Sequence, residues 1–181
     1  LNAHYKRIGW NARAQEGAVD GWYQTKFTLK EEPLVSILIP NKDHTDDLDV
    51  CLNSFFERAD YQNYEFIIIE NNSVLPETFA YYEKIEKEHD NVKVVYWEAG
   101  FNYSAINNFG FKFAKGDYIM LLNNDVELIT PDIFQSMLGF CMRPEVGIVG
   151  AKLLYSDDTV QHAGVVVGFG GYAGHVNIGI R

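Results

Sequence analysis

The strongest constraint on the fold is an alternation of short apolar runs with stretches of helical periodicity. Four β-rich runs occupy residues 35–39, 66–69, 92–96 and 118–122. Helical stretches follow them in turn, one beginning at Thr45, two covering 77–89 and 103–114, and one beginning at Thr130–Pro131. Strands that alternate with helices form a parallel sheet with helices on both faces. We therefore predict an α/β fold of Rossmann-like type, with a mostly parallel central sheet flanked by helices.

The two ends of the chain lack this alternation. Residues 1–33 are mixed and polar, and we interpret them as a lead-in or linker with a short helix around 3–15 and an extended piece around Trp22–Leu29. From Gly147 onward β segments follow one another around a turn at Asp157–Asp158, which predicts an irregular β-rich C-terminal part. We predict one domain over residues 34–181 and expect it to be truncated at its C-terminus.

Charge and composition limit the partners and the compartment. The chain carries 15 basic and 25 acidic side chains, for a formal net charge of -10, and this field repels a nucleic-acid backbone. No apolar run reaches the roughly 18 residues that a membrane helix needs, so we predict no spanning segment. Only two cysteines are present, and the first residues lack the apolar core of a signal peptide, which favours the cytoplasm. Cys51 falls on the apolar face of a predicted helix, where we interpret it as a core residue.

A polar cluster follows each of the four predicted strands. Ligands of open α/β sheets bind at the carboxyl ends of the strands, so we expect these clusters to form a site. Helix capping and turn formation are the alternative explanation, above all for Ser73 and Asn102. That alternative explains the fourth cluster least, because five apolar residues lead directly into it from the core. The clusters are Pro40-Asn41-Lys42-Asp43, Glu70-Asn71-Asn72-Ser73, Glu98-Ala99-Gly100-Phe101-Asn102 and Asn123-Asn124-Asp125.

The ligand types in the fourth cluster suit a hard cation. Oxygen ligands without His or Cys are typical of Mg²⁺ or Mn²⁺, which bind one or two carboxylates and complete their shell with substrate phosphates. Asp125 would be the charged ligand and Asn123 would offer a neutral oxygen. The residues alone therefore favour a metal-assisted nucleotide or sugar-phosphate site.

Four segments in this order resemble glycosyltransferase family 2, whose members have the GT-A fold. They are VSILIPNKD (35–43), YEFIIIENNS (64–73), FNYSAINNFG (101–110) and GDYIMLLNNDVEL (116–128). The resemblance covers about residues 34–180. It is closest to the bacterial branch that builds O-antigen, capsule or rhamnan-type polysaccharide, in which Gln161-His162-Ala163-Gly164 also recurs.

The resemblance implies an inverting transferase that moves a sugar from a nucleoside-diphosphate sugar to a hydroxyl of a glycan or lipid-linked glycan. It implies Mg²⁺ or Mn²⁺ as cofactor and a cytoplasmic location, with peripheral contact of the full protein at the inner face of the membrane left open. Asp125 and Asn123 would hold the metal at the position of the family's DxD motif. The implied nucleotide-binding residues are Pro40, Asn41, Lys42, Asp43, Glu70, Asn72, Asn107, Asn123 and Asn124.

The sequence departs from the family pattern at three positions. Asn123 replaces the first acid of the DxD motif, so the site has one negative charge fewer and metal binding is weaker. Glu70 stands where the family usually has Asp, facing the base, and Asn107 replaces a common Arg. Lys42 is then the candidate for neutralising, together with the metal, the negative charge of the diphosphate.

The resemblance places the base that accepts the acceptor's proton beyond Arg181. Within the chain Asp157 and Asp158 are candidates, but between two β runs we interpret them as a turn. His162 has two interpretations, a histidine satisfied within the β region or a contact to donor sugar or acceptor. Two other functions stay open: a binding or scaffolding domain without chemistry, and a sugar-phosphate nucleotidyltransferase, although Pro40–Asp43 lacks the glycine that its loop needs. The GxGxxA pattern at 168–173 lacks a following helix and acid, which argues against a dinucleotide site.

Overall fold

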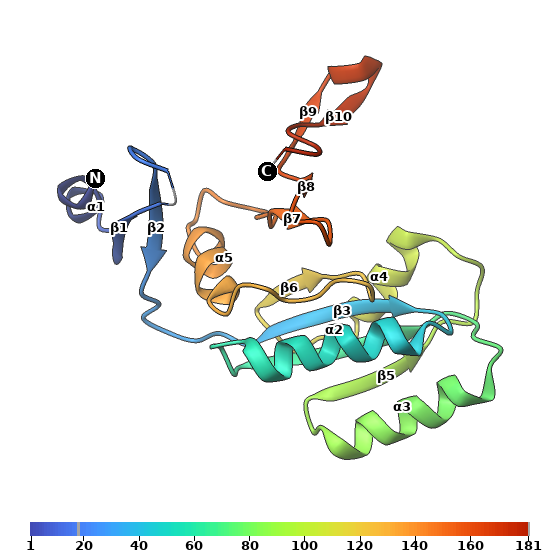
Figure 1. Ribbon diagram of the computed structural model, residues 1–181. Helices are drawn as coiled ribbons and strands as arrows, with labels where there is room; N and C mark the ends of the chain where they lie inside the picture. The colour runs from blue at the N-terminus through green and yellow to red at the C-terminus, as the bar shows by residue number, and fades with distance from the viewer. Residues whose placement is uncertain (18, 181) are drawn as a thin grey trace. The chain divides into compact units, whose positions relative to one another are not determined.

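The structure is a computed structural model that describes residues 1–17 and 19–180. Its main element is a four-stranded sheet in the order β5-β4-β3-β6, with all neighbours parallel (Figure 1). The α/β fold predicted from the alternation is confirmed. The strands are β3 (Val35–Asn41), β4 (Tyr64–Glu70), β5 (Val92–Tyr96) and β6 (Tyr118–Leu121).

Helices cover both faces of this sheet. Alternate residues of a strand point to opposite faces. On one face, Phe66 of β4 contacts Phe55 of α2 (Thr45–Arg58), with ring centroids 5.6 Å apart. Glu70 points to the same face and accepts a hydrogen bond from α3 (Pro76–Glu88). On the other face, Ile67 packs in one buried cluster with Ile106 of α4 (Tyr103–Phe111).

The predicted apolar helix faces are largely confirmed. Cys51 is fully buried, as its interpretation as a core residue requires. Tyr82 and Ile85 of α3 are also buried, whereas Phe79 is 37% exposed. Phe79 lies in the first turn of α3, where its ring contacts Tyr82 edge-on at 6.3 Å.

Strand β6 is less buried than its composition predicts. Its residues are half-buried and Leu121 is 51% exposed, so the expectation that this strand leads out of the core was wrong. The reason is its place in the sheet, because β6 is an edge strand that pairs with β3. The polar cluster Asn123–Asp125 therefore follows an outer strand of the sheet and not a central, buried one.

Backbone contacts divide the chain into two compact units, Lys30–Phe134 and Leu1–Leu29 with Gln135–Arg181. The first contains the parallel sheet. The second places the N-terminal segment with the C-terminal part, a different grouping from the predicted ranges 1–33 and 34–181, which remain a prediction.

The N-terminal segment differs from the expected helix around residues 3–15. Helix α1 covers only Asn2–Arg7, and Gly9, at φ +74°, turns the chain into an antiparallel hairpin. The hairpin joins β1 (Ala12–Glu16) to β2 (Tyr23–Phe27), which confirms the extended piece.

Helix α5 (Ile133–Cys141) begins in the first unit, and its residues from Gln135 onward belong to the second, where they pack against this hairpin. The rings of Phe27 and Phe140 meet edge-on at 4.7 Å, and a Cβ on Gly139 would lie 2.1 Å from the ring of Phe27. The prediction that this helix begins at Thr130–Pro131 was wrong, since the Thr130 carbonyl accepts a turn hydrogen bond from the Ile133 amide first.

The C-terminal part consists of short antiparallel strands, as predicted: β7 (Leu153–Leu154), β8 (Val160–His162), β9 (Val165–Val167) and β10 (Ala173–His175). The turn at Asp157–Asp158 is confirmed, with Asp157 accepting from the Thr159 amide at 3.0 Å. Between β9 and β10 the chain makes a 3₁₀ turn, η1 (Phe169–Gly171), so the glycine-rich pattern begins no dinucleotide-binding helix.

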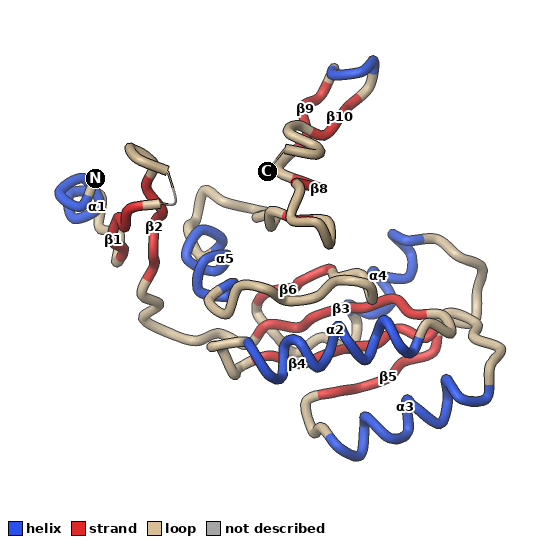
Figure 2. Tube along the Cα trace, viewed as in Figure 1, coloured by secondary structure: helices blue, strands red, loops and turns tan. Residues whose placement is uncertain are grey.

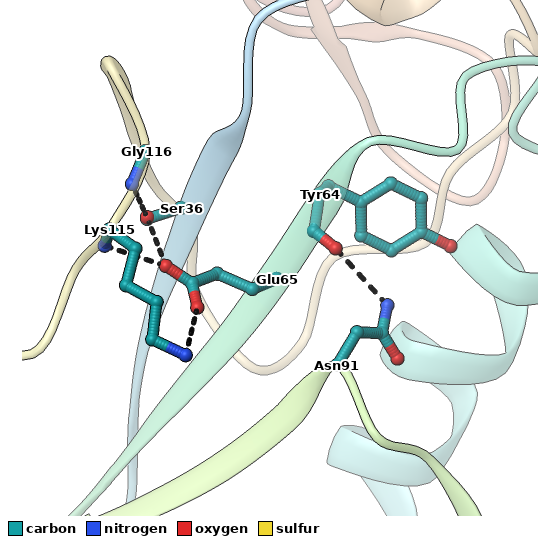
Figure 3. A network of polar contacts seen from close by, with 6 residues as sticks. All are labelled: Ser36, Tyr64, Glu65, Asn91, Lys115 and Gly116. Atoms are coloured by element: carbon teal, nitrogen blue, oxygen red, sulfur yellow. Dashed lines mark hydrogen bonds and ion pairs between the residues drawn. The ribbon is translucent and has the colours of Figure 1, made fainter.

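A polar network ties β3 and β4 to the turn before β6 (Figure 3). The Ser36 hydroxyl donates to Glu65 at 2.7 Å and accepts from the Gly116 amide at 2.9 Å. Glu65 also accepts from the Lys115 amide at 2.7 Å.

Ser36→Ala is expected to lower the free energy of unfolding by about 1–3 kcal/mol, because Ser36 is fully buried and the Gly116 amide loses its acceptor. Urea unfolding measures the change. Asn53→Ala, which removes an exposed hydrogen bond to Asp49, is the control and should stay within about 0.5 kcal/mol of the unaltered chain. Equal effects of the two substitutions would contradict the assignment.

Candidate functional site

The polar clusters that follow the strands lie together at the carboxyl ends of the strands, because parallel strands end on the same side of the sheet (Figure 2). Hydrogen bonds join the loops to one another there. Asn124 donates to the Asn41 side chain at 2.7 Å, and Ser73 accepts from the Asp43 amide at 2.8 Å. Asn72 donates to the Ala99 carbonyl at 2.8 Å. The structure thus brings all four clusters together.

The end of β4 carries a buried carboxylate. Glu70 is 3% exposed and accepts hydrogen bonds from the amide and hydroxyl of Ser73 and from the Tyr82 hydroxyl, the last at 2.8 Å. Ser73 therefore orders this loop. It does not cap α3, which begins after Leu75, so the capping interpretation of Ser73 was wrong. Asn102 does cap α4, by accepting from the Ala105 amide at 2.9 Å.

Asp43 anchors the loop after β3 to the start of α3. Its carboxylate accepts from the amides of Val74 and Leu75 at 3.0 and 3.1 Å and from the Thr78 hydroxyl at 3.2 Å. Burial acts to raise the pKa of Asp43, but these donors and the charge of Lys42 outweigh it, and the pKa lies below the ordinary 3.8. Lys42 itself is exposed.

The Asp43 bonds predict a pH-dependent effect of Asp43→Asn. The pKa of Asp43 is lower in the folded chain than in the unfolded chain. The carboxylate therefore contributes its full stabilisation at pH values above its unfolded-state pKa, and this stabilisation is lost as the pH falls through its folded-state pKa. We expect the unaltered chain to exceed the variant in stability at pH 7, and the difference to shrink below pH ~4. Urea unfolding across this range measures it, and a difference independent of pH would contradict this role.

The loop after β6 lies against one stripe of α2. The Cys51 thiol faces the Asn123 carbonyl at 3.9 Å, Ser54 accepts from the Leu128 amide at 2.9 Å, and Arg58 donates to the Leu128 carbonyl at 2.8 Å. Burial raises the pKa of Cys51 to about 12, and the charge of Asp125 adds to the rise. A hydrogen bond with the Val126 amide acts in the opposite direction and lowers this pKa. The loop backbone is therefore held by α2, while the Asn123 and Asp125 side chains are exposed.

Comparison with known proteins decides the family. The family model described as glycosyl transferase family 2 matches residues 36–166. The chain belongs to glycosyltransferase family 2. This match covers all four polar clusters and the sheet except its residue Val35.

Two relatives of this family 2 chain are similar along most of its length. O-antigen biosynthesis protein RfbC of Myxococcus xanthus is 41% identical over 175 residues, 97% of this chain and 14% of that protein. Protein y4gI of Sinorhizobium fredii is 42% identical over 159 residues, 88% of this chain and 18% of that protein. The chain therefore spans less than a fifth of either relative.

Solved structures confirm the GT-A type of fold. The mannosyltransferase PcManGT of Pyrobaculum calidifontis, solved in complex with GDP-Man and Mn²⁺, aligns with a TM-score of 0.59 at 14% identity, over 81% of this chain and 41% of that one. Residues 1-349 of S. aureus TarS align with a TM-score of 0.51 at 20% identity, over 60% of this chain and 32% of that one. In the described part of the family 2 chain, no helix has both the length and the apolar character needed to cross a membrane.

The oxygen ligands at the DxD position fit a hard cation whose coordination shell also includes oxygens of a substrate. Asp125 offers a carboxylate and Asn123 a carboxamide oxygen, both exposed. Among residues 1–17 and 19–180 no group of three or more His, Cys, Asp or Glu is placed to hold a metal. A cation at Asp125 would therefore take further ligands from outside these residue types, such as amide oxygens, water or substrate oxygens.

Two further predicted residues lie on other elements. Asn107 is buried on α4, donates to the Tyr103 carbonyl at 2.9 Å, and its side-chain oxygen has no partner among the described residues. His162 belongs to the other compact unit, where its Nδ1 lies 2.8 Å from Nδ1 of His175.

Sequence reasoning missed Tyr82, which hydrogen-bonds to both Asn41 and Glu70. The sequence places this residue only within the predicted helix over 77–89, at helical spacing from Ile85. The only sequence signal for a polar role was its hydroxyl group, because a buried tyrosine hydroxyl needs a partner.

Proposed function

We propose that this chain is the donor-binding domain of a glycosyltransferase that moves a sugar from a nucleoside-diphosphate sugar to an acceptor hydroxyl with inversion. The observation that carries the proposal is the hydrogen-bonded convergence of four polar loops at one sheet edge, next to the exposed Asp125. Family membership makes sugar transfer the activity to which such a site is suited.

The side chains divide between the two ends of the donor. Glu70 and the loops of Pro40–Asp43 and Asn72 surround the base side, and Asn123 and Asn124 lie toward the ribose and diphosphate. Asp125 and Asn123 would hold Mg²⁺ or Mn²⁺, which when bound neutralises negative charge on the departing diphosphate. Lys42 is exposed and free to approach the same phosphates.

Two further residues and the base complete the proposed site. Asn107, whose buried side-chain oxygen has no partner within residues 1–17 and 19–180, is proposed on the nucleotide side. His162 is proposed as a contact to the donor sugar or the acceptor, and the proton-accepting base is proposed to lie outside residues 1–181.

The biological setting is proposed from the relatives. The Myxococcus xanthus relative is named for O-antigen biosynthesis, which supports bacterial surface polysaccharide as the product and a glycan or lipid-linked glycan as the acceptor. Solved structures of similar fold contain GDP-Man with Mn²⁺ or UDP-GlcNAc, which supports a nucleotide-sugar donor. Assembly of such a product from nucleotide sugars supports a cytoplasmic location, at the inner face of the membrane.

Calorimetric titration with uridine, thymidine and guanosine diphosphates, each with and without Mn²⁺, tests the proposal. We expect one of them to bind, and more tightly when Mn²⁺ is present. If none binds under either condition, the donor assignment is wrong.

The second candidate is a binding or scaffolding domain that keeps the fold without the chemistry. It is favoured by one observation, the neutral Asn123 at the position of an acid. The same titration separates the two, since a scaffolding domain would show no metal-dependent nucleotide binding. A nucleotidyltransferase is disfavoured by the loop Pro40–Asp43, which has no glycine to approach phosphates.

A further inference from the structure

Four polar side chains form a continuous row beneath the candidate site. Asn124 donates to the Asn41 oxygen at 2.7 Å, the Asn41 amide donates to the Tyr82 hydroxyl at 2.8 Å, and that hydroxyl donates to Glu70 at 2.8 Å. The row joins the loop after β6, strand β3, helix α3 and the end of β4. It thereby links the loop that carries Asp125 to the carboxylate on the base side.

The carboxylate fixes the direction of every bond in the row. A carboxylate only accepts, so the single proton of the Tyr82 hydroxyl is committed to Glu70. The hydroxyl must then accept from the Asn41 NH₂ group, which leaves the Asn41 oxygen turned toward Asn124. The orientation of the Asn41 amide is therefore set from the far end of the row.

Burial makes the row costly to break. Tyr82 is fully buried, and Asn41 and Glu70 are 2% and 3% exposed, so water does not readily replace a partner lost among these three. Asn124, at the loop end of the row, is half-buried. A buried polar group left without a partner carries the full penalty of desolvation. The row is thus stiffer than a surface hydrogen bond between the same groups.

We propose that Asn41 and Tyr82 are positioning residues, which hold the Asn123–Asp125 loop in its diphosphate-binding position before the donor arrives. The proposal rests on the proposed function for its ligand, and on the row itself for its mechanism. A preorganised loop lowers the cost of ordering on binding. Loss of the row then weakens the metal-dependent part of donor binding.

The test is Tyr82→Phe, which removes one oxygen and keeps the ring that packs in the core. Tyr81→Phe is the matched control, because Tyr81 is the neighbouring residue of α3 and its hydroxyl donates to Asp49 at 3.1 Å, outside the row. Two quantities are measured. The first is amide hydrogen exchange of residues 123–128 in the ligand-free protein, and the second is the factor by which Mn²⁺ tightens nucleoside-diphosphate binding.

We expect Tyr82→Phe to speed exchange in residues 123–128 about tenfold and to reduce the Mn²⁺ factor by a similar amount, the loss of one buried hydrogen bond. Tyr81→Phe should change neither quantity. Asn41→Leu, which leaves the Tyr82–Glu70 bond intact, should reproduce both changes and decides the matter if Tyr82→Phe does not fold.

The two readouts separate failure of the row from failure of the donor assignment. Unchanged exchange in both row variants overturns the positioning role, whatever the chain binds. Faster exchange with an unchanged Mn²⁺ factor also overturns it. If the unaltered chain binds no nucleoside diphosphate, the proposed function fails, and with it the assignment of this row to donor binding.

Discussion

Asp125→Asn is expected to reduce the Mn²⁺-dependent gain in nucleoside-diphosphate affinity by about 100-fold. The substitution keeps the size of the side chain and removes the carboxylate of the Asn123–Asp125 cluster. Neutral Asn123 cannot compensate, since hard cations of this type depend on at least one charged oxygen ligand. Loss of a directly bound ligand should cost at least as much as loss of a supporting residue, for which 10- to 100-fold is typical.

Calorimetry with and without Mn²⁺ measures this gain, and Asp117→Asn is the control. Asp117 is an exposed carboxylate that immediately precedes β6, at the opposite end of the same strand. Equal losses in the two variants would indicate a general effect of charge and would remove Asp125 from the metal site.

Glu70→Ala is expected to lower the free energy of unfolding by about 3 kcal/mol and to abolish nucleoside-diphosphate binding with or without metal. The carboxylate is buried and accepts three hydrogen bonds, two from Ser73 and one from Tyr82. Hydrogen bonds to charged groups contribute about 1.5–3 kcal/mol each, and their loss leaves buried donors without partners. The net loss is smaller than the sum of the three bonds, because the variant no longer bears the cost of burying a charge. The loop after β4 should then lose the conformation that faces the base.

Urea unfolding and calorimetry give the two quantities, and Glu88→Ala is the reference. Glu88 lies exposed at the end of α3, 3.8 Å from Lys84, so its replacement should change stability by less than about 1 kcal/mol and leave binding intact. A Glu70 variant as stable as the reference would contradict the structural role of the buried carboxylate.

The parallel sheet could be predicted because two independent patterns agreed on it. Runs such as 66–69 were too short and too β-branched for helices, while Leu48, Cys51, Leu52 and Phe55 repeated at helical spacing. The position of β6 in the sheet could not be read from its composition. Apolar character predicts burial only when the neighbours of a strand are known, and β6 lies at an edge.

The sequence predicted where the polar clusters of the candidate site lie, but not which of their side chains contact one another. The rule that ligands bind at the carboxyl ends of parallel strands located the four polar clusters correctly. Which side chains are exposed and which are committed to one another depends on three-dimensional distances. Asp43 and Glu70 are held by α3 and its preceding loop, whereas Asp125 is exposed. Tyr82 was missed because helical periodicity cannot distinguish a core ring from a buried hydroxyl that links two strands.

The central claim is that a divalent cation and a nucleoside diphosphate bind together at the carboxyl edge of the parallel sheet. Paramagnetic broadening of the amide signals of the isotope-labelled chain tests it most directly, with Mn²⁺ and the tightest-binding nucleoside diphosphate, against Mg²⁺ as the diamagnetic reference. We expect broadening centred on Asn123–Asp125 and extending to Pro40–Asp43. Broadening centred on His162 and His175, or absent throughout the chain, would contradict the account.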